Sequence, residues 1–346
     1  MKTDLVFHEL FTKHVLSPGH PESPKRVNTA LDALKKSDLL DSGRVNMLQP
    51  RPAHSDEVRT IHSKSYLEEV KERSDSGGGY FTLDTSVNEY TFDAAMHAAG
   101  GGIQTVNRIL DGEAKNSFIL CRPPGHHAEY DRALGFCFIN NIAVAARHLV
   151  SRRGMRRVLI IDYDAHHGNG TQNAFYSERE VFYVGIHQDG RTLFPGTGFV
   201  HERGEGKGEG YNVNLPMYPG CGDISYDLLL RKIIKPLVDE FSPEFILISA
   251  GFDCHFRDRL TSLSLTTSGI AKMNNSLNQI AKDHCEGRIA FFLEGGYDLD
   301  VMRQASVNLI EVLTGLPRTE YGDVMEENTV SVEKTRQLIE TVEKYR

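Results

Sequence analysis

The sequence predicts an α/β protein in which helices wrap a parallel sheet. Short runs of β-branched and aromatic residues alternate along the chain with longer segments of helical periodicity. Several of these runs are apolar throughout, which is typical of central strands covered on both faces. With 346 residues, of which 40% are hydrophobic and 25% charged, the chain is also long enough to bury a large core.

The expected strands and helices follow one another in order. Runs typical of strands occupy 4–7, 117–121, 157–162, 181–187, 245–251 and 289–296, and YNVNLP at 211–216 also looks like a strand. Helical periodicity appears near 24–40, 91–110, 138–152, 223–240, 266–284 and 300–314, and again at about 331–345. Two glycine-rich stretches, 74–81 and 203–211, are expected to be loops, and no internal repeat is visible. We therefore predict that residues 1–346 form a single domain.

Composition and charge argue against several classes of protein. A formal net charge of −8 disfavours a protein that binds the phosphate backbone of nucleic acids. The N-terminus does not resemble a secretory signal, and no run of about 18 apolar residues occurs. We therefore expect a cytoplasmic protein that does not associate with membranes, and the oligomeric state stays open. The cysteines are odd in number and form no C-x-x-C pair, which predicts reduced, mostly buried thiols.

Clusters of polar residues follow four of the expected strands at the point where each strand ends. They are RPPGHHAEYDRALGFCFINN (122–141), DYDAHHGNG (162–170), AGFDCHFRD (250–258) and EGGYD (294–298). In open α/β sheets, ligands bind beyond the carboxyl ends of the strands. We therefore expect these four loops to converge on one site.

Asp164 and His166 indicate a metal site within this cluster. They lie two residues apart, so in an extended segment their side chains point the same way and can bind one ion. Asp253, in a distant polar loop, is the best candidate for a third ligand. Two carboxylates and one imidazole suit zinc, with iron(II) or cobalt as alternatives, and leave room for water and a substrate oxygen. A buried Asp–His pair without metal is the other interpretation of these residues.

The adjacent His126 and His127 are candidate acceptors for the proton of a water activated by such a metal. Adjacent histidines are usually exposed or loosely packed, but here the preceding Pro-Pro-Gly restricts the backbone. Each imidazole needs an orienting acceptor, and Asp162 and Asn169 could provide one apiece.

Six motifs carry a resemblance to a known family. RPPGHHA, GFCFINN, DYDAHHGNGTQ, FPGTG, GFDCH and LEGGYD occur in this order over about residues 15–315. The chain resembles the zinc-dependent histone deacetylase family, which includes bacterial and archaeal relatives and acetylpolyamine amidohydrolases. The resemblance implies the arginase/deacetylase fold, an eight-stranded parallel sheet with helices on both faces. It also implies hydrolysis of an acylated amine to acetate and the free amine.

The resemblance assigns metal ions to specific residues. It implies that Asp164, His166 and Asp253 bind the catalytic zinc ion. It also implies a structural potassium ion, which the backbone carbonyls of Asp162, Asp164 and His166 would bind behind the zinc.

The resemblance further assigns catalytic roles. His127 would act first as general base and then as general acid, and Asn169 would accept a hydrogen bond from it. His126, paired with Asp162, would help to position the water. Tyr297 would donate its hydroxyl hydrogen to the substrate carbonyl as negative charge develops there.

A substrate tunnel is implied as well. Phe136 and Phe194 would wall a narrow passage for an acyl-lysine-like chain, with Gly135 and Leu260 also lining it. Arg26 would lie at the foot of the tunnel, near the departing acetate.

Details of the motifs place the chain within the family but leave the substrate open. Asn169 and LEGGYD resemble the second class of deacetylases and its prokaryotic relatives, and the presence of Tyr297 favours an active enzyme. Cys254 and Arg259 depart from the usual pattern, and Arg259 puts the substrate choice in doubt. An acetylated lysine side chain is the first expectation and an acetylated polyamine the alternative.

The rim residues bear on this choice. Leu260 occupies the place where polyamine-selective relatives have a glutamate, which argues for lysine. Glu22, Glu129 and Asp131 lie in loops that could still supply a charge. A non-catalytic acyl-lysine reader is disfavoured by the intact ligand set, and a binuclear manganese ureohydrolase by Gly168, where a second carboxylate would be needed.

Overall fold

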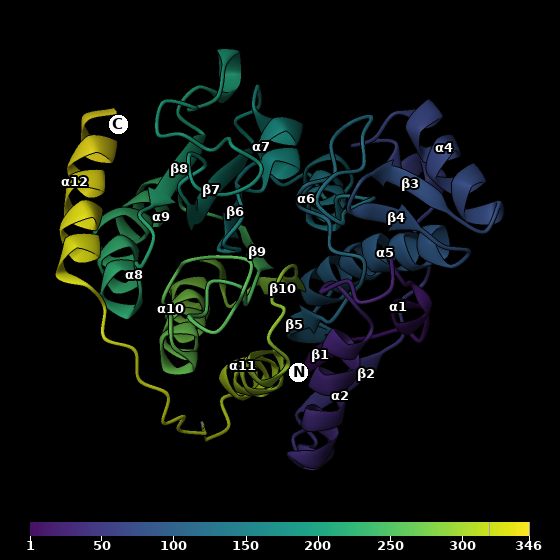
Figure 1. Cartoon of the computed structure of the whole chain (residues 1–346), viewed down its shortest axis with the longest axis horizontal. Helices are drawn as coiled ribbons and strands as arrows, with labels where there is room; N and C mark the ends of the chain where they lie inside the picture. Colours follow the sequence, from purple (N-terminus) through teal and green to yellow (C-terminus); the bar gives the residue numbers. More distant parts are fainter. Residues whose placement is uncertain (318, 346) are drawn as a thin grey trace.

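The computed structural model describes residues 1–317 and 319–345, whose main element is one sheet of eight parallel strands (Figure 1). Across the sheet the strands lie in the order β2-β1-β5-β10-β9-β6-β7-β8. Their bounds are β1 Lys2–Val6, β2 Val45–Leu48, β5 Ala114–Ile119, β6 Val158–Asp162, β7 Val181–Gln188, β8 Asn212–Met217, β9 Phe245–Ala250 and β10 Ile289–Leu293. The principal helices are α2 Lys25–Lys36, α4 Lys64–Asp75, α5 Thr91–Leu110, α6 Asn141–Ser151, α8 Asp223–Leu229, α9 Lys235–Phe241, α10 Thr267–Cys285, α11 Leu299–Thr314 and α12 Thr329–Tyr345. Shorter helices are α1 Leu10–Lys13, α3 Ser55–Val58 and α7 Asn169–Phe175.

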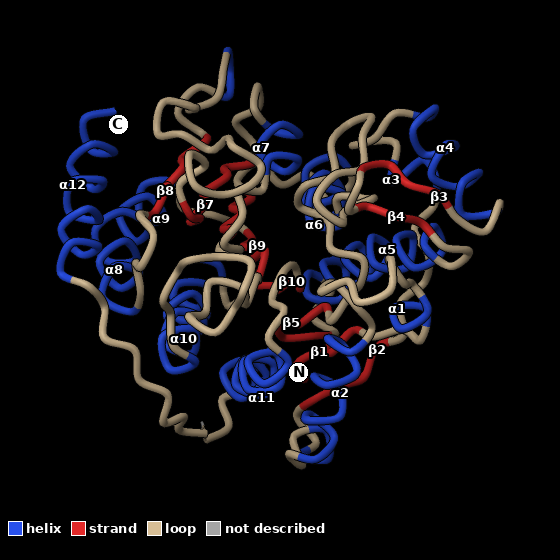
Figure 2. Tube along the Cα trace, in the orientation of Figure 1, coloured by secondary structure: helices blue, strands red, loops and turns tan. Residues whose placement is uncertain are grey.

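Helices cover both faces of the sheet because successive residues of its strands point to opposite sides. Ile161 and Phe291 belong to one buried cluster, together with residues of α2, α8, α10 and α11. Their neighbours Ile160 and Phe292 belong to the other cluster, with residues of α5 and α6. Figures 1 and 2 show α10 and α11 on one side of the strands and α5 and α6 on the other. The predicted fold is therefore confirmed.

The central strands are the apolar ones. Every residue of β6, β9 and β10 is buried. Burial on both faces leaves no solvated side. This explains why these strands read as nearly continuous apolar runs, broken only by Ser249 in β9 and by Asp162 at the end of β6, rather than as alternating ones. Their parallel registers place the carboxyl ends of the four neighbouring strands β5, β10, β9 and β6 at one edge of the sheet.

Some elements differ from the sequence prediction. Strand β2 was not expected, and the glycine-rich stretch 74–81 is not entirely loop, because β3 (Gly79–Thr82) pairs there with β4 (Thr85–Val87) in an antiparallel hairpin. The expected helix 223–240 is interrupted by a π-helical turn at Leu230–Ile234, between α8 and α9. These departures depend on pairing and packing with other segments, which local periodicity does not encode.

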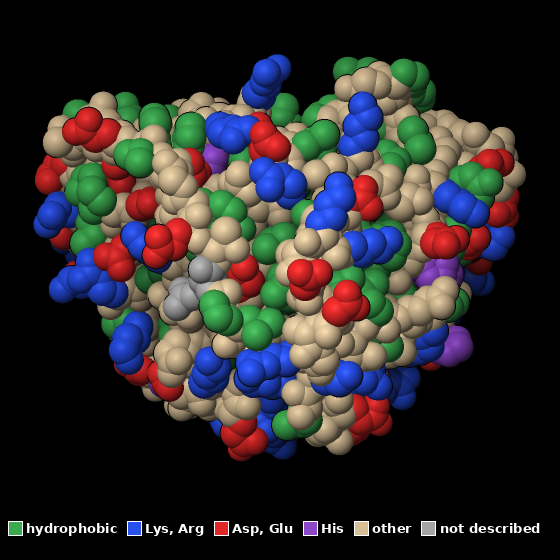
Figure 3. Space-filling view, turned by 90° about the horizontal axis from the view of Figure 1, so that it is seen from below, with side chains coloured by type: hydrophobic (Ala, Val, Ile, Leu, Met, Phe, Trp, Pro, Cys, Tyr) green, Lys and Arg blue, Asp and Glu red, His purple; other side chains and the backbone are tan. Residues whose placement is uncertain are grey.

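The surface carries charges of both signs. On the face in Figure 3, lysine and arginine side chains lie among aspartate and glutamate side chains over most of the area. Among the described residues, no helix has both the length and the apolar character needed to cross a membrane.

Candidate active site at the carboxyl edge of the sheet

The four polar loops converge because the strands that precede them are neighbours in the sheet. Residues 122–141 follow β5, 162–170 follow β6, 250–258 follow β9 and 294–298 follow β10. These four strands are consecutive in the sheet, in the order β5-β10-β9-β6. The four polar loops therefore lie together at the carboxyl ends of neighbouring strands, the position at which ligands usually bind in open α/β sheets.

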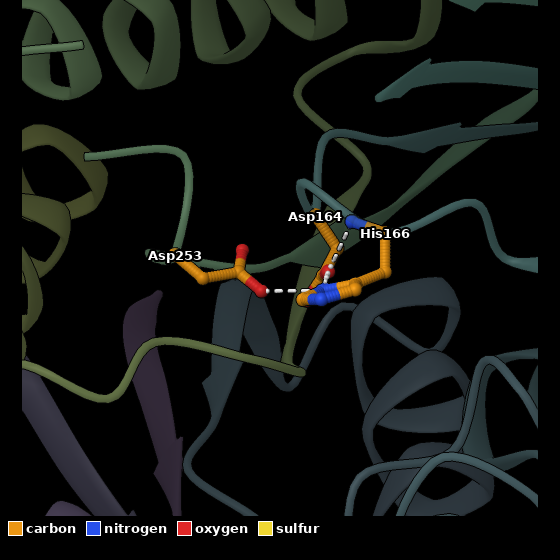
Figure 4. A group of neighbouring side chains, drawn as sticks. All are labelled: Asp164, His166 and Asp253. Atoms are coloured by element: carbon orange, nitrogen blue, oxygen red, sulfur yellow. Dashed lines mark hydrogen bonds and ion pairs between the residues drawn. The ribbon is translucent and has the colours of Figure 1, made fainter. Parts of the chain in front are cut away.

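Asp164, His166 and Asp253 form a compact group at the centre of this site (Figure 4). Nδ1 of His166 lies 3.1 Å from Oδ1 of Asp164 and 2.9 Å from Oδ2 of Asp253. One oxygen from each carboxylate and one ring nitrogen all lie within 4.8 Å of one another. Both aspartates are buried, and His166 is largely so.

The donor set fits a cation better than a proton. One ring nitrogen carries at most one proton, yet Nδ1 of His166 faces two carboxylates. Burial lowers the pKa of His166, but the two carboxylates outweigh it and raise this pKa to about 10. Burial and the neighbouring Asp164 raise the pKa of Asp253. A divalent cation among the three groups would neutralise both buried carboxylates and leave the imidazole neutral.

The other carboxylate oxygens are held by the backbone. Oδ2 of Asp164 accepts from the Gly295 N–H at 2.7 Å, and Oδ1 of Asp253 accepts from the Ala165 N–H at 2.9 Å. The backbone approaches closely here, since a Cβ on Gly295 would lie 2.4 Å from Oδ2 of Asp253. A Cβ on Gly251 would lie 2.2 Å from Oδ2 of Asp164. The glycines in these motifs therefore make room for the carboxylates.

His126 and His127 lie side by side above this group, with ring centroids 4.0 Å apart. Nδ1 of His126 is 3.0 Å from Oδ2 of Asp162, and Nδ1 of His127 is 2.7 Å from Oδ1 of Asn169. The structure thus pairs each histidine with its expected acceptor. The His127 ring also lies 6.0 Å from the ring of His166.

Opposite electrostatic environments separate these two histidines. Burial lowers the pKa of His126, but Asp162 and Asp164 outweigh it and raise this pKa to about 10. Burial, together with the nearby His126 and His166, lowers the pKa of His127 well below its usual value. Two adjacent titratable groups with opposed shifts are typical of a site that divides acid and base roles.

Glu294 is a buried residue of this site to which the sequence analysis assigned no role. Its Oε2 accepts from the N–H of Gly125 at 2.7 Å and from that of His126 at 3.2 Å, and its Oε1 accepts from Oγ of Ser249 at 3.1 Å. Burial raises the pKa of Glu294 to about 7. The sequence signal that could have identified Glu294 was its place in EGGYD, directly after an apolar strand. Glu294 therefore ties the histidine loop to the central strands.

Tyr297 and Arg26 lie together on another side of the site. The backbone N–H of Tyr297 donates to Oδ2 of Asp258 at 2.8 Å, and burial raises the pKa of its phenol well above the usual value. The guanidinium of Arg26 lies 5.0 Å from the Tyr297 ring centroid. Arg26 is buried and donates to the carbonyl oxygens of Gly296 and Glu294 at 2.6 and 2.5 Å.

Three of the residues expected to line a tunnel lie beside His127 and Tyr297. The Phe194 ring lies 5.1 Å from the His127 ring, and Phe136 meets Tyr297 edge-on at 6.1 Å. A Cβ on Gly135, where φ is +54°, would lie 2.4 Å from Cδ2 of His127 and 3.0 Å from Cε1 of Phe194. Gly135 is therefore both conformationally and sterically required to be glycine.

Leu260 and Phe194 are the exposed members of this set, at 38% and 42% of their surface. The N–H of Leu260 donates to Oδ1 of Asp258 at 2.9 Å, and Oδ2 of the same carboxylate holds Tyr297. Asp258 thus links the partly exposed Leu260 to the loop that carries Tyr297.

Glu22 does not supply a charge to the rim, contrary to one expectation from the sequence. It is fully buried and pairs with Arg122 and with Arg26, whose Nη1 is 3.1 Å from Oε1. Glu129 faces Asn169 and Asn173 instead. Sequence position alone could not reveal these partners, because they come from segments up to 100 residues away.

Comparison with known proteins agrees with this geometry. The family model described as "Histone deacetylase domain" matches residues 20–313. The chain is 41% identical over 316 residues to a "Probable deacetylase" of Archaeoglobus fulgidus, covering 91% of this chain and 87% of that protein. It is 34% identical to the "Histone deacetylase-like amidohydrolase" of Pseudomonas aeruginosa, covering 93% and 86%.

A solved structure extends the agreement to three dimensions. The crystal structure of the HDA15 HD domain superposes with a TM-score of 0.88 at 35% sequence identity, covering 98% of this chain and 95% of that one. The match to the family model spans most of the chain and includes all four polar loops. The chain therefore belongs to the histone deacetylase family.

Proposed function

We propose that this protein is a zinc-dependent amidohydrolase that removes acetyl or other acyl groups from the ε-amine of lysine in proteins or peptides and releases acetate. One observation carries the proposal, namely the buried Asp164, His166 and Asp253 group faced by the adjacent His126 and His127. Two carboxylates and one imidazole form an open ligand set for a catalytic metal. Family membership supports the hydrolase class.

The three-residue group would hold the zinc ion. When bound, the ion would supply Lewis-acid polarisation of the acyl carbonyl and lower the pKa of a water. Iron(II) remains the alternative metal because the same ligands accept it. We further propose a structural potassium ion on the backbone carbonyls of Asp162, Asp164 and His166.

In this proposal, His127 transfers the proton. Its Nδ1 faces Asn169, which leaves Nε2 free to take a proton from water and then to give it to the departing amine. The lowered pKa of His127 supports a neutral ring at the start of the reaction. His126, held by Asp162 and carrying a raised pKa, supplies positive charge beside the reacting atoms.

Tyr297 would stabilise the acyl oxygen. Its raised pKa keeps the phenol protonated, so the hydroxyl can donate to that oxygen as charge develops. Phe136, Phe194 and Gly135 would form the walls of a passage for an extended alkyl chain, with Leu260 at its rim. Arg26, buried behind the Tyr297 ring, would attract the acetate product.

The rim favours acetyl-lysine over an acetylated polyamine. A polyamine carries a second amine, which needs a carboxylate partner at the rim. Glu22 is buried beneath two arginines and cannot reach a substrate at the rim. Asp258 is occupied by two backbone N–H groups, and Leu260 offers only an apolar surface. An acetylated polyamine is the alternative substrate, because Asp131, in the polar loop 122–141, is exposed.

Turnover of the zinc-loaded protein on an acetyl-lysine peptide, acetylputrescine and acetylspermidine tests the substrate. We expect kcat/KM to favour the peptide by at least about tenfold, which corresponds to about 1.4 kcal/mol of transition-state binding. A preference for the polyamines would reject the lysine assignment, and no hydrolysis of any of the three would reject the proposed function.

Two variants test the roles of the residues. Tyr297→Phe should retain bound zinc but lose most turnover, whereas Asp253→Ala should lose the zinc itself. Metal content by atomic emission and kcat on the preferred substrate separate the two. Full activity in Tyr297→Phe would contradict the role assigned to its hydroxyl.

A further inference from the structure

Glu129 bonds to the residue that orients His127. Asn169 and Asn173 lie four residues apart in α7 and therefore share one face of the helix. The Nδ2 of Asn169 donates to Oε1 of Glu129 at 2.5 Å, and that of Asn173 donates to both carboxylate oxygens at 3.0 and 2.9 Å. With the 2.7 Å contact between Oδ1 of Asn169 and Nδ1 of His127, a continuous row His127–Asn169–Glu129 results.

The chemistry of this row leaves one arrangement of donors and acceptors. A carboxylate only accepts, so Glu129 must face the NH2 group of Asn169. The amide oxygen then faces Nδ1 of His127, which has to carry the ring hydrogen. Nε2 of the neutral ring is therefore the basic nitrogen. With the amide reversed, its NH2 group would face Nδ1 and drive the ring hydrogen to Nε2.

The surroundings hold Glu129 in place for this task. Its backbone carbonyl oxygen lies 2.7 Å from Nδ1 of His62, and its N–H donates to the carbonyl of Arg132 at 2.9 Å. A Cβ on Gly170 would lie only 2.2 Å from the carbonyl oxygen of Ala128, so the loop packs tightly against α7. A cavity of about 290 Å³ borders Glu129.

We propose that Glu129 is a positioning residue for His127 and acts through Asn169, whose amide it holds in the orientation that leaves Nε2 of His127 unprotonated. The inference rests on the proposed function, in which Nε2 takes a proton from water. A purely structural Glu129 would tie the loop to α7 without affecting the tautomer of His127. The two roles differ in their effects on kcat and on the ring nitrogens.

Kinetics of the zinc-loaded protein on its preferred substrate provide the first test. Glu129→Met removes the carboxylate acceptor, and Nδ2 of Asn169 keeps only the 3.5 Å contact with the carbonyl oxygen of His127. We expect kcat to fall about tenfold with KM within twofold, because one charge-assisted hydrogen bond no longer selects the tautomer. Asn173→Ala is the matched control, since it removes the other partner of Glu129 but leaves the row to His127 intact. Its kcat should stay within twofold of the wild type.

Measurements in an Asn169→Asp background distinguish positioning of the residue-169 side chain by Glu129 from simple packing by Glu129. Asn169→Asp offers His127 an acceptor oxygen in either orientation, so adding Glu129→Met in this background should cost no activity. A similar loss in both backgrounds would show that Glu129 acts through packing and would overturn the proposal. A kcat for Glu129→Met within twofold of the wild type would overturn it as well.

Nuclear magnetic resonance of the wild-type zinc-loaded protein, with ¹⁵N-labelled histidine, gives a readout that needs neither turnover nor a stable variant. We expect His127 to carry its hydrogen on Nδ1 and to show an unprotonated Nε2. A hydrogen on Nε2 would refute the proposal. Because this readout is independent of substrate, it also distinguishes failure of the proposal from failure of the assigned function.

Discussion

Replacement of Glu294 by glutamine should change how stability depends on pH. Burial raises the pKa of Glu294 from 4.5 to about 7, so the folded protein holds this proton more tightly than the unfolded chain. The stabilisation that protonated Glu294 gives the folded protein is fully present below about pH 4.5 and is lost as the pH rises through about 7. This difference in pKa corresponds to about 3 kcal/mol in the free energy of unfolding, because each pKa unit corresponds to about 1.4 kcal/mol.

Glutamine is a close match for this site and does not ionise. Its oxygen can accept from the N–H groups of Gly125 and His126, and its NH2 group can donate to Oγ of Ser249. The stability of Glu294→Gln relative to the wild type should therefore rise by up to about 3 kcal/mol between pH 4.5 and pH 8. With an unfolding entropy of about 2.1 cal/mol/K per residue, this is a relative increase in Tm of about 4 °C for 346 residues.

Thermal unfolding of both proteins across this pH range, with a chelator present throughout, is the assay. The chelator keeps both proteins free of bound metal, and the difference in Tm cancels the titration of groups remote from Glu294. A difference in Tm that stays constant, or that falls as the pH rises, would refute the assigned ionisation of Glu294.

Three other predictions concern the site and its support. Gly135→Ala should lower kcat/KM by about a hundredfold, because the added methyl lies 2.4 Å from Cδ2 of His127 and displaces the ring; activity within threefold of the wild type would contradict this. Chelation of divalent metal should lower the Tm measured by calorimetry, because two buried carboxylates lose their cation, and zinc should restore it; an unchanged Tm would argue against a metal in the three-residue group. Arg122→Ala should destabilise the fold by about 3–5 kcal/mol in urea unfolding, because it removes a partner of the buried Glu22; a loss below about 1 kcal/mol would contradict that role.

Local patterns in the sequence were enough to predict the central strands and the convergence of the polar loops that follow them. Strand β9 is apolar except for Ser249 because both of its faces are buried, and a polar loop follows it directly. Asp164 and His166 could be paired from a spacing of two alone. Asp253 could be added because it also follows a strand end, and parallel strands bring such ends to one edge.

Residues whose environment depends on distant segments were harder to predict. Strand β2 is a short edge strand that is mostly not fully buried, so it lacks the apolar run that marks a central strand. Glu22 looked like a loop residue available to a substrate, whereas Arg122 and Arg26 bury it completely. No local pattern encodes the pairing with Arg122, which lies 100 residues away.

The sequence by itself determined the fold class, the four polar loops and the residues able to bind a metal. These features follow from residue type and spacing, which act over a few neighbouring positions. Only the tertiary structure decided that Glu294 lies beneath the histidine loop and that Glu129 faces Asn169. The physical reason is that a side chain's burial and hydrogen-bond partners come from segments that meet only when the sheet assembles.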